Sequence, residues 1–335
     1  MTPEETVADR TPLTDVLLDA ELDAAFAAHR AELTGYCYRM LGAPSEAEDA
    51  VQETLLRAWK AQDGFEGRAK VRTWLYRIAH NVCIDMHRSP QRRARPMEMG
   101  PSTPLSELVL GDQRDEHAFV QPAPDSSVID LSGDPADVAA ARETVRLAFV
   151  AALQRLPSRQ RSVLIMCEVL RMPAAEVADL LGTTLASVNS ALQRARATLA
   201  ERPVERLGDP LEPQHQQLLD RYVDAFERYD IDQLVTLLRE DAVLSMPPWD
   251  TWLQGRDDLH DFYLGPGADC RGSKLLPIAL NGCAGFAQYR RTGPGVWEPW
   301  SMQVIEVADG WITAHHNFLY PSTFLAFGFP AVIRD

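Results

Sequence analysis

Within residues 97–137 the sequence shows no regular spacing of apolar residues, and this segment therefore limits how the chain can fold. Proline, serine and glycine recur through it, so neither a helix nor a strand can continue across it. A single basic residue, Arg114, stands against a series of acidic residues: Glu98, Glu107, Asp112, Asp115, Glu116, Asp125, Asp130, Asp134 and Asp137. This composition predicts a flexible acidic linker at 96–137.

The linker divides the chain into modules. At 335 residues the chain is too long for one ordinary core, so two or three domains are expected. Helical periodicity occupies 18–95 and resumes at 138–203, and a break at Gly208-Asp209-Pro210 precedes a third module at 212–335. There, helices at 214–229 and 231–239 precede alternating β-like runs at 242–246, 284–290, 302–307 and 311–318, which predicts an α+β domain.

The composition indicates a cytoplasmic protein. No run of about 18 apolar residues is present, and the first residues do not form a charged head with an apolar signal core, so we expect no membrane association. The cysteines, five in number, are scattered and include no CxxC pair, which favours reduced thiols.

The first module combines an acidic helix with a basic one. In the acidic helix, Ser45 and Glu48 have the spacing of a capping box, and Val51, Leu55 and Trp59 form a predicted buried stripe. Asp49, Gln52 and Glu53 lie away from that stripe and remain available to a partner.

The basic helix has an apolar face and a polar face. The apolar face holds Val71, Trp74, Leu75, Ile78 and Val82, and the polar face holds Arg77, Asn81, Asp85 and Arg88. Although the chain carries a net charge of −15, basic residues dominate between positions 66 and 95: Arg68, Lys70, Arg72, Arg77, Arg88, Arg92, Arg93 and Arg95.

Arginines interleaved with Trp74, Tyr76 and His80 are typical of single-stranded DNA binding, which needs cations for phosphates and aromatic faces for bases. The alternative is that Trp74, on the apolar face, belongs to the core. His80, Cys83 and His87 could share a helix face as zinc ligands, but no fourth ligand is nearby, so no metal or other cofactor is expected.

The second module contains a helix-turn-helix pattern at 173–199. Gly182 ends the first of its helices, and after a turn Ser187 precedes a helix that buries Val188, Leu192, Ala195 and Leu199. The other face presents side chains that can read base edges in a major groove: Asn189, Ser190, Gln193, Arg194 and Arg196. The alternative is a three-helix bundle whose polar face is merely solvated.

These residues support a family resemblance. The runs at 49–54 (Asp-Ala-Val-Gln-Glu-Thr) and 72–81 (Arg-Thr-Trp-Leu-Tyr-Arg-Ile-Ala-His-Asn), with Asp85, resemble the second region of extracytoplasmic-function sigma factors of RNA polymerase. Residues 141–199, with Leu156-Pro157, Gln160-Arg161 and Glu176-Val177-Ala178, resemble their fourth region. The linker is longer and more acidic than minimal members of that family need.

The resemblance implies two all-α sigma domains. It also implies core RNA polymerase and promoter DNA as partners, with an anti-sigma protein as a further possible partner. Contacts to polymerase would come from Asp49, Gln52, Glu53 and Leu56. The −10 element would be melted and read within 68–93, by Arg68, Arg72, Trp74, Arg77, Asn81, Asp85, Arg88 and Arg92. The −35 element would be read by Ser187, Asn189, Ser190, Gln193, Arg194 and Arg196.

The third module resembles the cone-shaped SnoaL-like domains of the nuclear-transport-factor-two-like superfold. Its marks are Met246-Pro247-Pro248-Trp249 and the turn Gln254-Gly255-Arg256. The resemblance predicts a pocket for a small-molecule ligand, lined by Trp249, Trp252, Tyr289 and His315. Further candidates are Asp250, His260 and His316, although His315 and His316, adjacent on a strand, must face opposite sides.

Fold alone does not settle activity, because this fold hosts both enzymes and binding modules. Asp250 and His315 could act as an acid/base pair, but no nucleophile elbow, phosphate loop or metal-ligand spacing supports catalysis. We therefore expect a regulatory domain and a protein that is not an enzyme. The alternatives are an enzymatic third module tethered to DNA, and a helix-turn-helix repressor, which would leave the 72–81 run unexplained.

Overall fold

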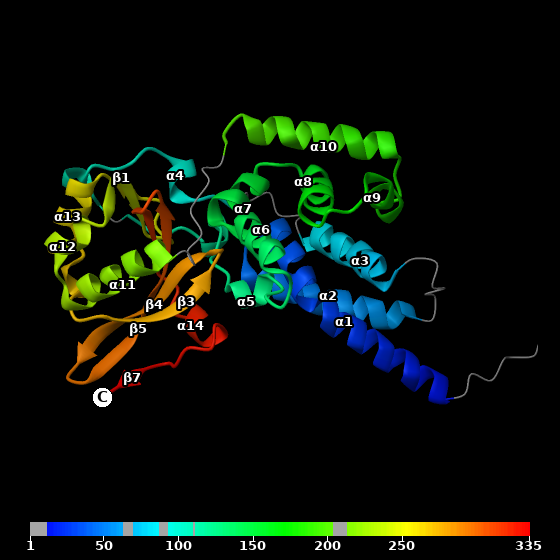
Figure 1. Cartoon of the computed structure of the whole chain (residues 1–335), viewed down its shortest axis with the longest axis horizontal. Helices are drawn as coiled ribbons and strands as arrows, with labels where there is room; N and C mark the ends of the chain where they lie inside the picture. The colour runs from blue at the N-terminus through cyan, green and yellow to red at the C-terminus, as the bar shows by residue number, and fades with distance from the viewer. Residues whose placement is uncertain (1–11, 63–69, 87–92, 110, 204–212) are drawn as a thin grey trace, which may run out of the picture.

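A computed structural model of the chain describes residues 12–62, 70–86, 93–109, 111–203 and 213–335. Helices of the first two modules occupy one end of the molecule, and a sheet with its own helices occupies the other (Figure 1). The predicted architecture of two helical modules and a C-terminal α+β domain is confirmed.

The first module packs three helices: α1 (Pro12–Leu41), α2 (Pro44–Ala61) and α3 (Val71–Met86). Two predictions about α2 are wrong. The cap residue is Ala43, without a side-chain bond, so Ser45 and Glu48 form no capping box. Trp59 is 43% exposed. Successive steps of four residues rotate about 40° around a helix, so the predicted stripe leaves the core at its end: Val51 is fully buried, Leu55 is partly buried against the core, and Trp59 is exposed. The other buried residues of α2 are Ala47, Ala50, Thr54 and Ala58.

The second module carries the helix-turn-helix. Its helices are α6 (Pro135–Val145), α7 (Leu147–Gln154), α8 (Ser158–Leu164) with the π-helical turn η4 (Ile165–Val169), α9 (Ala174–Leu180) and α10 (Leu185–Ala200). Gly182, with φ of 58°, follows the end of α9 as predicted. The cap of α10 is Thr184, whose hydroxyl accepts a bond from the Ser187 amide, so α10 begins earlier than the predicted start after Ser187.

The segment predicted to be a flexible linker contains regular structure. It forms α4 (Pro96–Met99), the 3₁₀ turns η2 (Leu105–Glu107) and η3 (Glu116–Ala118), α5 (Asp125–Val128) and the start of α6. Its acidic residues are not merely solvated. Asp115 and Asp134 cap η3 and α6, and the carboxylate of Asp125, with only 2% of its side chain exposed, accepts a hydrogen bond of 2.8 Å from the Gly282 amide.

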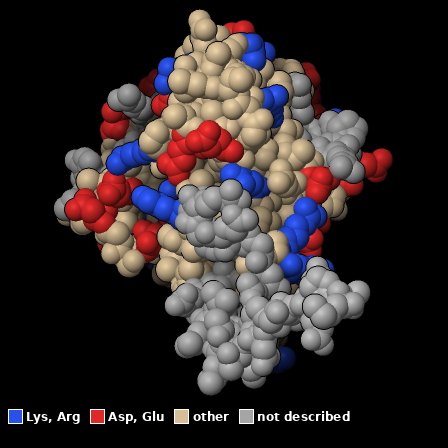
Figure 2. Space-filling model, turned by 90° about the vertical axis from the view of Figure 1, so that its right-hand side faces the viewer, with Lys and Arg blue, Asp and Glu red and all other residues tan. Residues whose placement is uncertain are grey.

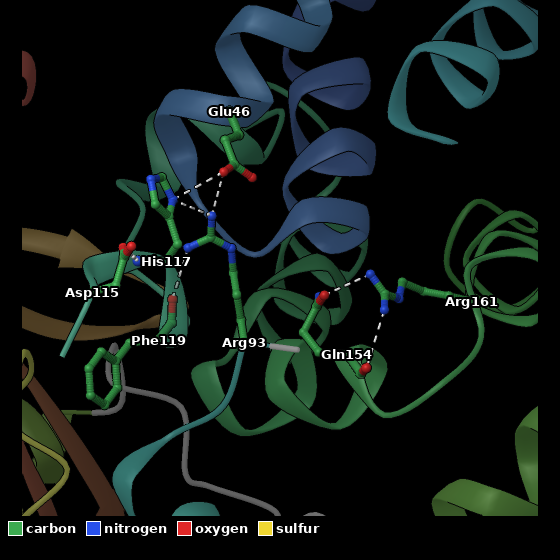
Figure 3. A network of polar contacts seen from close by, with 7 residues as sticks. All are labelled: Glu46, Arg93, Asp115, His117, Phe119, Gln154 and Arg161. Carbon is green, nitrogen blue, oxygen red and sulfur yellow. Dashed lines mark hydrogen bonds and ion pairs between the residues drawn. The ribbon is translucent and has the colours of Figure 1, made fainter. Parts of the chain in front are cut away.

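Arg93 anchors the start of the linker to the first module. Its guanidinium is buried between the carboxylate of Glu46 in α2 and the linker, where it donates to the Phe119 carbonyl at 3.2 Å and to His117 Nδ1 at 3.1 Å (Figure 3). Arg93, the last residue of the basic segment 68–93, therefore holds the linker to the first module.

The third module is a seven-stranded sheet with most of its helices on one face. The helices are α11 (Pro213–Arg228), α12 (Ile231–Val235) and α13 (Arg256–Leu264), with the short η5 (Ala268–Cys270) and α14 (Thr323–Ala326). The strands are β1 (Leu238–Ser245), β2 (Trp252–Gln254), β3 (Lys274–Leu280), β4 (Cys283–Gly293), β5 (Val296–Ala308), β6 (Trp311–Phe318) and β7 (Ile333–Arg334). The predicted helix at 231–239 is too long, because β1 already begins at Leu238.

The two faces of the sheet belong to different cores. The strand order is β2-β1-β6-β5-β4-β3, with β7 beside β5, and only the β1–β6 pair is parallel. Helices α11 to α13 cover one face and enclose a core of their own. The other face joins the core of the first two modules, where Cys283 and Val304 belong to the same cluster as Tyr38 and Val145.

The turn between β3 and β4 contacts three other parts of the molecule. Asn281 and Gly282 connect β3 to β4, and Asn281 is fully buried. Its amide nitrogen donates to the Tyr38 hydroxyl of α1 at 2.6 Å and to the Val145 carbonyl of α6 at 2.7 Å. Its amide oxygen accepts from the linker amide of Ala123 at 2.9 Å. The third module therefore contacts both helical modules and the linker through one side chain.

Candidate nucleic-acid interface

Helix α3 presents the polar face that the sequence predicts. Arg77, Asn81 and Asp85 are exposed, and Trp74 is half-buried against the core. Buried side chains on the other side are Thr73, Leu75, Tyr76, Ala79, Val82 and Cys83. Three further predicted contacts, Arg68, Arg88 and Arg92, lie outside the described residues.

The arginines of this region are paired within the chain. Arg72 donates to the Glu32 carboxylate at 3.0 Å, and its guanidinium carbon lies 5.1 Å from the Tyr76 ring centroid. Arg57 of α2 pairs with Asp85 at 3.1 Å. Side chains of both signs are interspersed over this end of the molecule in Figure 2. The Arg57–Asp85 pair is exposed, and exposed ion pairs contribute little energy.

Helix α10 exposes most of its predicted base-reading side chains. Asn189, Gln193, Arg194 and Arg196 are exposed, and Ser187 and Ser190 are half-buried. Arg196 pairs with Glu168 across the surface, and Arg159 of α8 donates to the Ser187 hydroxyl at 3.4 Å. Helix α10 is held by Val188, Ala191 and Ala195, which are buried against the rest of the module.

The two modules are closed against each other at α3, which the sequence does not predict. Thr73 donates its hydroxyl to the Glu176 carboxylate of α9 at 2.6 Å, and Arg77 donates to the Asp179 carbonyl at 3.5 Å. Each of these contacts spans more than one hundred residues of sequence, so no local pattern announces them. The predicted −10 helix therefore touches the helix-turn-helix.

His80 belongs to this contact between modules. Its Nδ1 lies 2.8 Å from the Ser162 hydroxyl of α8 and 3.3 Å from the Tyr36 hydroxyl of α1. Burial lowers the pKa of His80 to about 4, so the ring is neutral near pH 7. Of the three residues considered for zinc, Cys83 is buried and His87 lies outside the described residues, among which no metal-binding cluster occurs.

The exposed face of α2 carries the residues predicted to bind polymerase. Asp49 and Gln52 are exposed, Glu53 pairs with Arg57 at 2.7 Å, and Leu56 is 48% exposed. Trp59 adds a second large apolar side chain to this face, so α2 offers an apolar patch with an acidic rim. Patches of this kind mark protein contacts.

The cone of the third module contains a cavity of about 250 Å³ between α13 and the sheet, and only one of the four predicted pocket residues, Trp249, lines it. Tyr289 points to the opposite face of β4, where its hydroxyl donates to the Pro330 carbonyl at 2.7 Å. Trp252 instead donates its indole N–H to the Gly100 carbonyl of the linker at 3.0 Å.

His315 lies deeper in the cone and is held between two tyrosines. The Tyr263 hydroxyl lies 2.5 Å from Nδ1 and the Tyr222 hydroxyl 3.2 Å from Nε2. Burial lowers the pKa of His315 to about 3, so the ring is neutral. Asp250, its proposed acid/base partner, instead binds Arg114 of the linker, so the structure does not bring this pair together.

The remaining candidates lie elsewhere. His260 is bonded to Asp232 and Asp261 at the surface, and the carboxylates raise its pKa. His316 faces away from the cone, as the alternation along β6 requires, and its Nδ1 lies 2.8 Å from the Ser245 hydroxyl. The helices of the described ranges include none that is both long and apolar enough to cross a membrane.

Known families match all three modules. Residues 25–93 match the family described as Sigma-70 region 2, residues 146–199 match Sigma-70, region 4, and residues 219–315 match the SnoaL-like domain. The order of these matches along the chain is the order that the sequence predicts.

Relatives match along most of the chain. The "ECF RNA polymerase sigma factor SigG" of Mycobacterium tuberculosis (strain ATCC 25618 / H37Rv) is 44% identical over 316 residues, which cover 91% of this chain and 84% of SigG. The "ECF RNA polymerase sigma factor SigJ" of the same strain is 28% identical and covers 89% of this chain. The crystal structure of SigJ matches 92% of this chain and 99% of its own with a TM-score of 0.60 at 23% identity, which supports the fold.

Proposed function

Because this chain belongs to the ECF family of RNA polymerase sigma factors, we propose that it binds core RNA polymerase through α2, opens and reads the −10 element with α3, and reads the −35 element with α10. The observation that carries this division of work is the pair of exposed polar faces, one on α3 and one on α10, each backed by a buried apolar face.

The contact between α3 and α9 holds the two proposed DNA-reading helices close together. Elements centred at −10 and −35 lie about 25 base pairs apart, or about 85 Å at about 3.4 Å per pair. Helix α10, with 16 residues, is only about 24 Å long and follows α9 directly, so in this arrangement α3 and α10 cannot reach both elements. Promoter recognition therefore requires the two modules to separate.

The third module acts as a regulator of this separation. Its Asn281 side chain bonds simultaneously to α1, α6 and the linker, so it stabilises the closed arrangement. A regulatory role fits better than catalysis, because the neutral ring of His315 is enclosed by Tyr222 and Tyr263 and Asp250 is paired with Arg114. An anti-sigma protein remains an expectation of the family resemblance.

Transcription in vitro tests the function. Purified protein and core polymerase should give run-off transcripts from promoters obtained from genomic fragments that the complex binds. If no such promoter supports initiation, the chain is not a sigma factor in the proposed sense. Promoter affinity should also fall as salt rises, because arginines that replace condensed cations on phosphates release those ions.

The substitution Arg194→Ala should weaken recognition of the upstream element. Arg194 is exposed on α10 and bonds only to Ser190 within the described contacts, so it is available to a guanine edge. We expect a loss of roughly 1–3 kcal/mol in binding of the polymerase complex to its promoter, measured by titration of labelled DNA. Arg228→Ala, an exposed arginine on α11, is the control and should bind normally. Equal loss on scrambled upstream DNA would show that Arg194 contacts a phosphate instead.

A further inference from the structure

The cavity of the third module has walls that suit a flat aromatic molecule. Its aromatic side chains come from two helices, a loop and a strand: Phe226, Trp249, Phe262, Tyr263 and Trp300. Aromatic faces on several sides of a space of about 250 Å³ favour a planar ring over a flexible chain. A cavity of this size holds a molecule of one or two rings, smaller than a typical drug.

Arg290 supplies the cation of the cavity. Its guanidinium carbon lies 4.0 Å from the Trp300 ring centroid, which fixes the group against the wall. Its acidic partner, Asp269, is 3.1 Å away, but the Asp269 side chain is 81% exposed, whereas that of Arg290 is 24% exposed. Because solvent screens such a pair, a ligand carboxylate can replace Asp269 and form a bidentate contact with the guanidinium.

The polar side chains deeper in the cone are already occupied by each other. Gln288 accepts from the Ser301 hydroxyl at 2.8 Å and from Gln303 at 3.0 Å, and it donates to Ser273 at 3.0 Å. Among the described residues that line the cavity, Arg290 and Asp269 are the charged ones. Arg290 is therefore the group of the described cavity wall that can pair with a ligand anion.

We propose that this cavity binds a small aromatic carboxylate, with the ring between the aromatic walls and the carboxylate on Arg290. A neutral aromatic molecule would gain the ring contacts alone, and an amine would face Arg290 with a like charge. The site is distinct from the DNA-reading faces of α3 and α10.

The same cavity is in contact with the linker. Trp249, one of its walls, donates its indole N–H to the Gly111 carbonyl at 2.9 Å. Beside it, the Arg114 amide donates to the Pro248 carbonyl at 3.0 Å, and the Arg114 guanidinium binds Asp250 at 2.6 Å. Leu105 packs against the core of the cone. The linker runs along β1 and α13 in Figure 1.

Occupancy of the cavity is therefore coupled to docking of the linker. The docked linker holds the Trp249 indole in place, and the ligand ring packs against that indole. Ligand binding therefore stabilises the docked linker, and a docked linker raises the affinity for the ligand. This coupling rests on the proposed function, since it matters only if the linker controls separation of the two DNA-reading modules. The ligand thus favours the closed sigma factor.

Cinnamate tests the inference on the full-length protein, with cinnamyl alcohol as its neutral counterpart. Calorimetric titration should detect cinnamate binding. Arg290→Gln should raise the dissociation constant of cinnamate by roughly 10- to 100-fold, because the variant loses a charge-assisted hydrogen bond. Arg291→Gln is the matched control, because the adjacent Arg291 is exposed and its Nε donates to the Gly293 carbonyl. Circular dichroism confirms that both variants fold.

Amide hydrogen exchange measures the coupling. Cinnamate should slow exchange at Thr103, Leu105 and Arg114, whose amides bond to the third module, in the wild type and in Arg291→Gln but not in Arg290→Gln. No binding at about 1 mM cinnamate would overturn the site. If cinnamyl alcohol bound as tightly as cinnamate, the proposed contact between the carboxylate and Arg290 would be wrong. If cinnamate left the amide exchange of the linker unchanged, the coupling between ligand and linker would be wrong. Neither assay contains polymerase, so these failures are distinguishable from a failure to initiate transcription.

Discussion

Asn281→Ala should lower the free energy of unfolding by about 3–5 kcal/mol, because it leaves several buried polar groups without partners. The Ala123 amide loses its acceptor at 2.9 Å, and the Val145 carbonyl loses its donor at 2.7 Å. The Tyr38 hydroxyl, which donates to Gln121, also loses the bond it accepts. The measurement is denaturant unfolding followed by both fluorescence and circular dichroism.

Asp309→Ala is the control for Asn281→Ala. Asp309 has φ of 52°, Asn281 has φ of 54°, and each precedes a glycine with positive φ in a turn between strands. Asp309 is exposed, so its replacement tests the backbone conformation without the buried contacts. We expect a loss of about 1 kcal/mol there. Similar losses of unfolding free energy in the two variants would mean that Asn281 stabilises the protein only through its backbone conformation.

Asn281→Ala should also change transcription initiation. Without the Asn281 side-chain bonds to α1, α6 and the Ala123 amide, the closed arrangement loses contacts that the separated arrangement does not have. Among molecules that remain folded, Asn281→Ala should therefore initiate more transcripts per bound polymerase than the wild type. Asp309→Ala should leave initiation unchanged, and equal initiation by the two variants would contradict the regulatory role of the turn.

Arg161→Met should have the second large effect, a loss of about 3 kcal/mol or more in stability. Arg161 is 1% exposed and donates to the Leu153 carbonyl at 2.9 Å. It also donates to the Gln154 side chain at 2.7 Å (Figure 3). It also donates to the Met40 carbonyl at the end of α1, so it joins the two helical modules. Methionine fills similar space but donates no hydrogen bond.

Arg159→Met provides the comparison in the same helix. Arg159 is exposed and donates to the Thr183 hydroxyl at 2.8 Å, so its loss should cost less than about 1 kcal/mol. Thermal unfolding of both variants by calorimetry measures the difference. If Arg161→Met were as stable as Arg159→Met, the buried guanidinium would not hold the modules together.

Sequence reasoning succeeds where the signals are local. The end of α9 at Gly182 and the polar face of α10 follow from a turn glycine and from helical spacing, both within a few residues. Strand β3 is not among the predicted strands, and it contains Pro277. The sheet tolerates this proline because β3 lies at its edge.

The contacts that close the molecule could not be predicted in the same way. The Asn281–Gly282 pair between apolar runs is a recognisable hairpin signal, but its partner Tyr38 lies 243 residues away in sequence. The acidic linker illustrates the same limit. Composition predicts flexibility there, whereas Asp125 is buried under Gly282 and Arg142 because tertiary contacts supply partners for its charge.

Initiation requires α3 and α9 to separate, and a reversible cross-link between these two helices tests this requirement. Thr73 and Glu176, in contact at 2.6 Å, are replaced by cysteines and joined with a short, reducible thiol reagent. The single-cysteine variants, treated with the same reagent, control for labelling of the natural thiols. Run-off transcription with core polymerase should be lost in the cross-linked protein and restored by reduction. Equal initiation before and after reduction would show that the closed arrangement is compatible with promoter recognition, and would contradict the account.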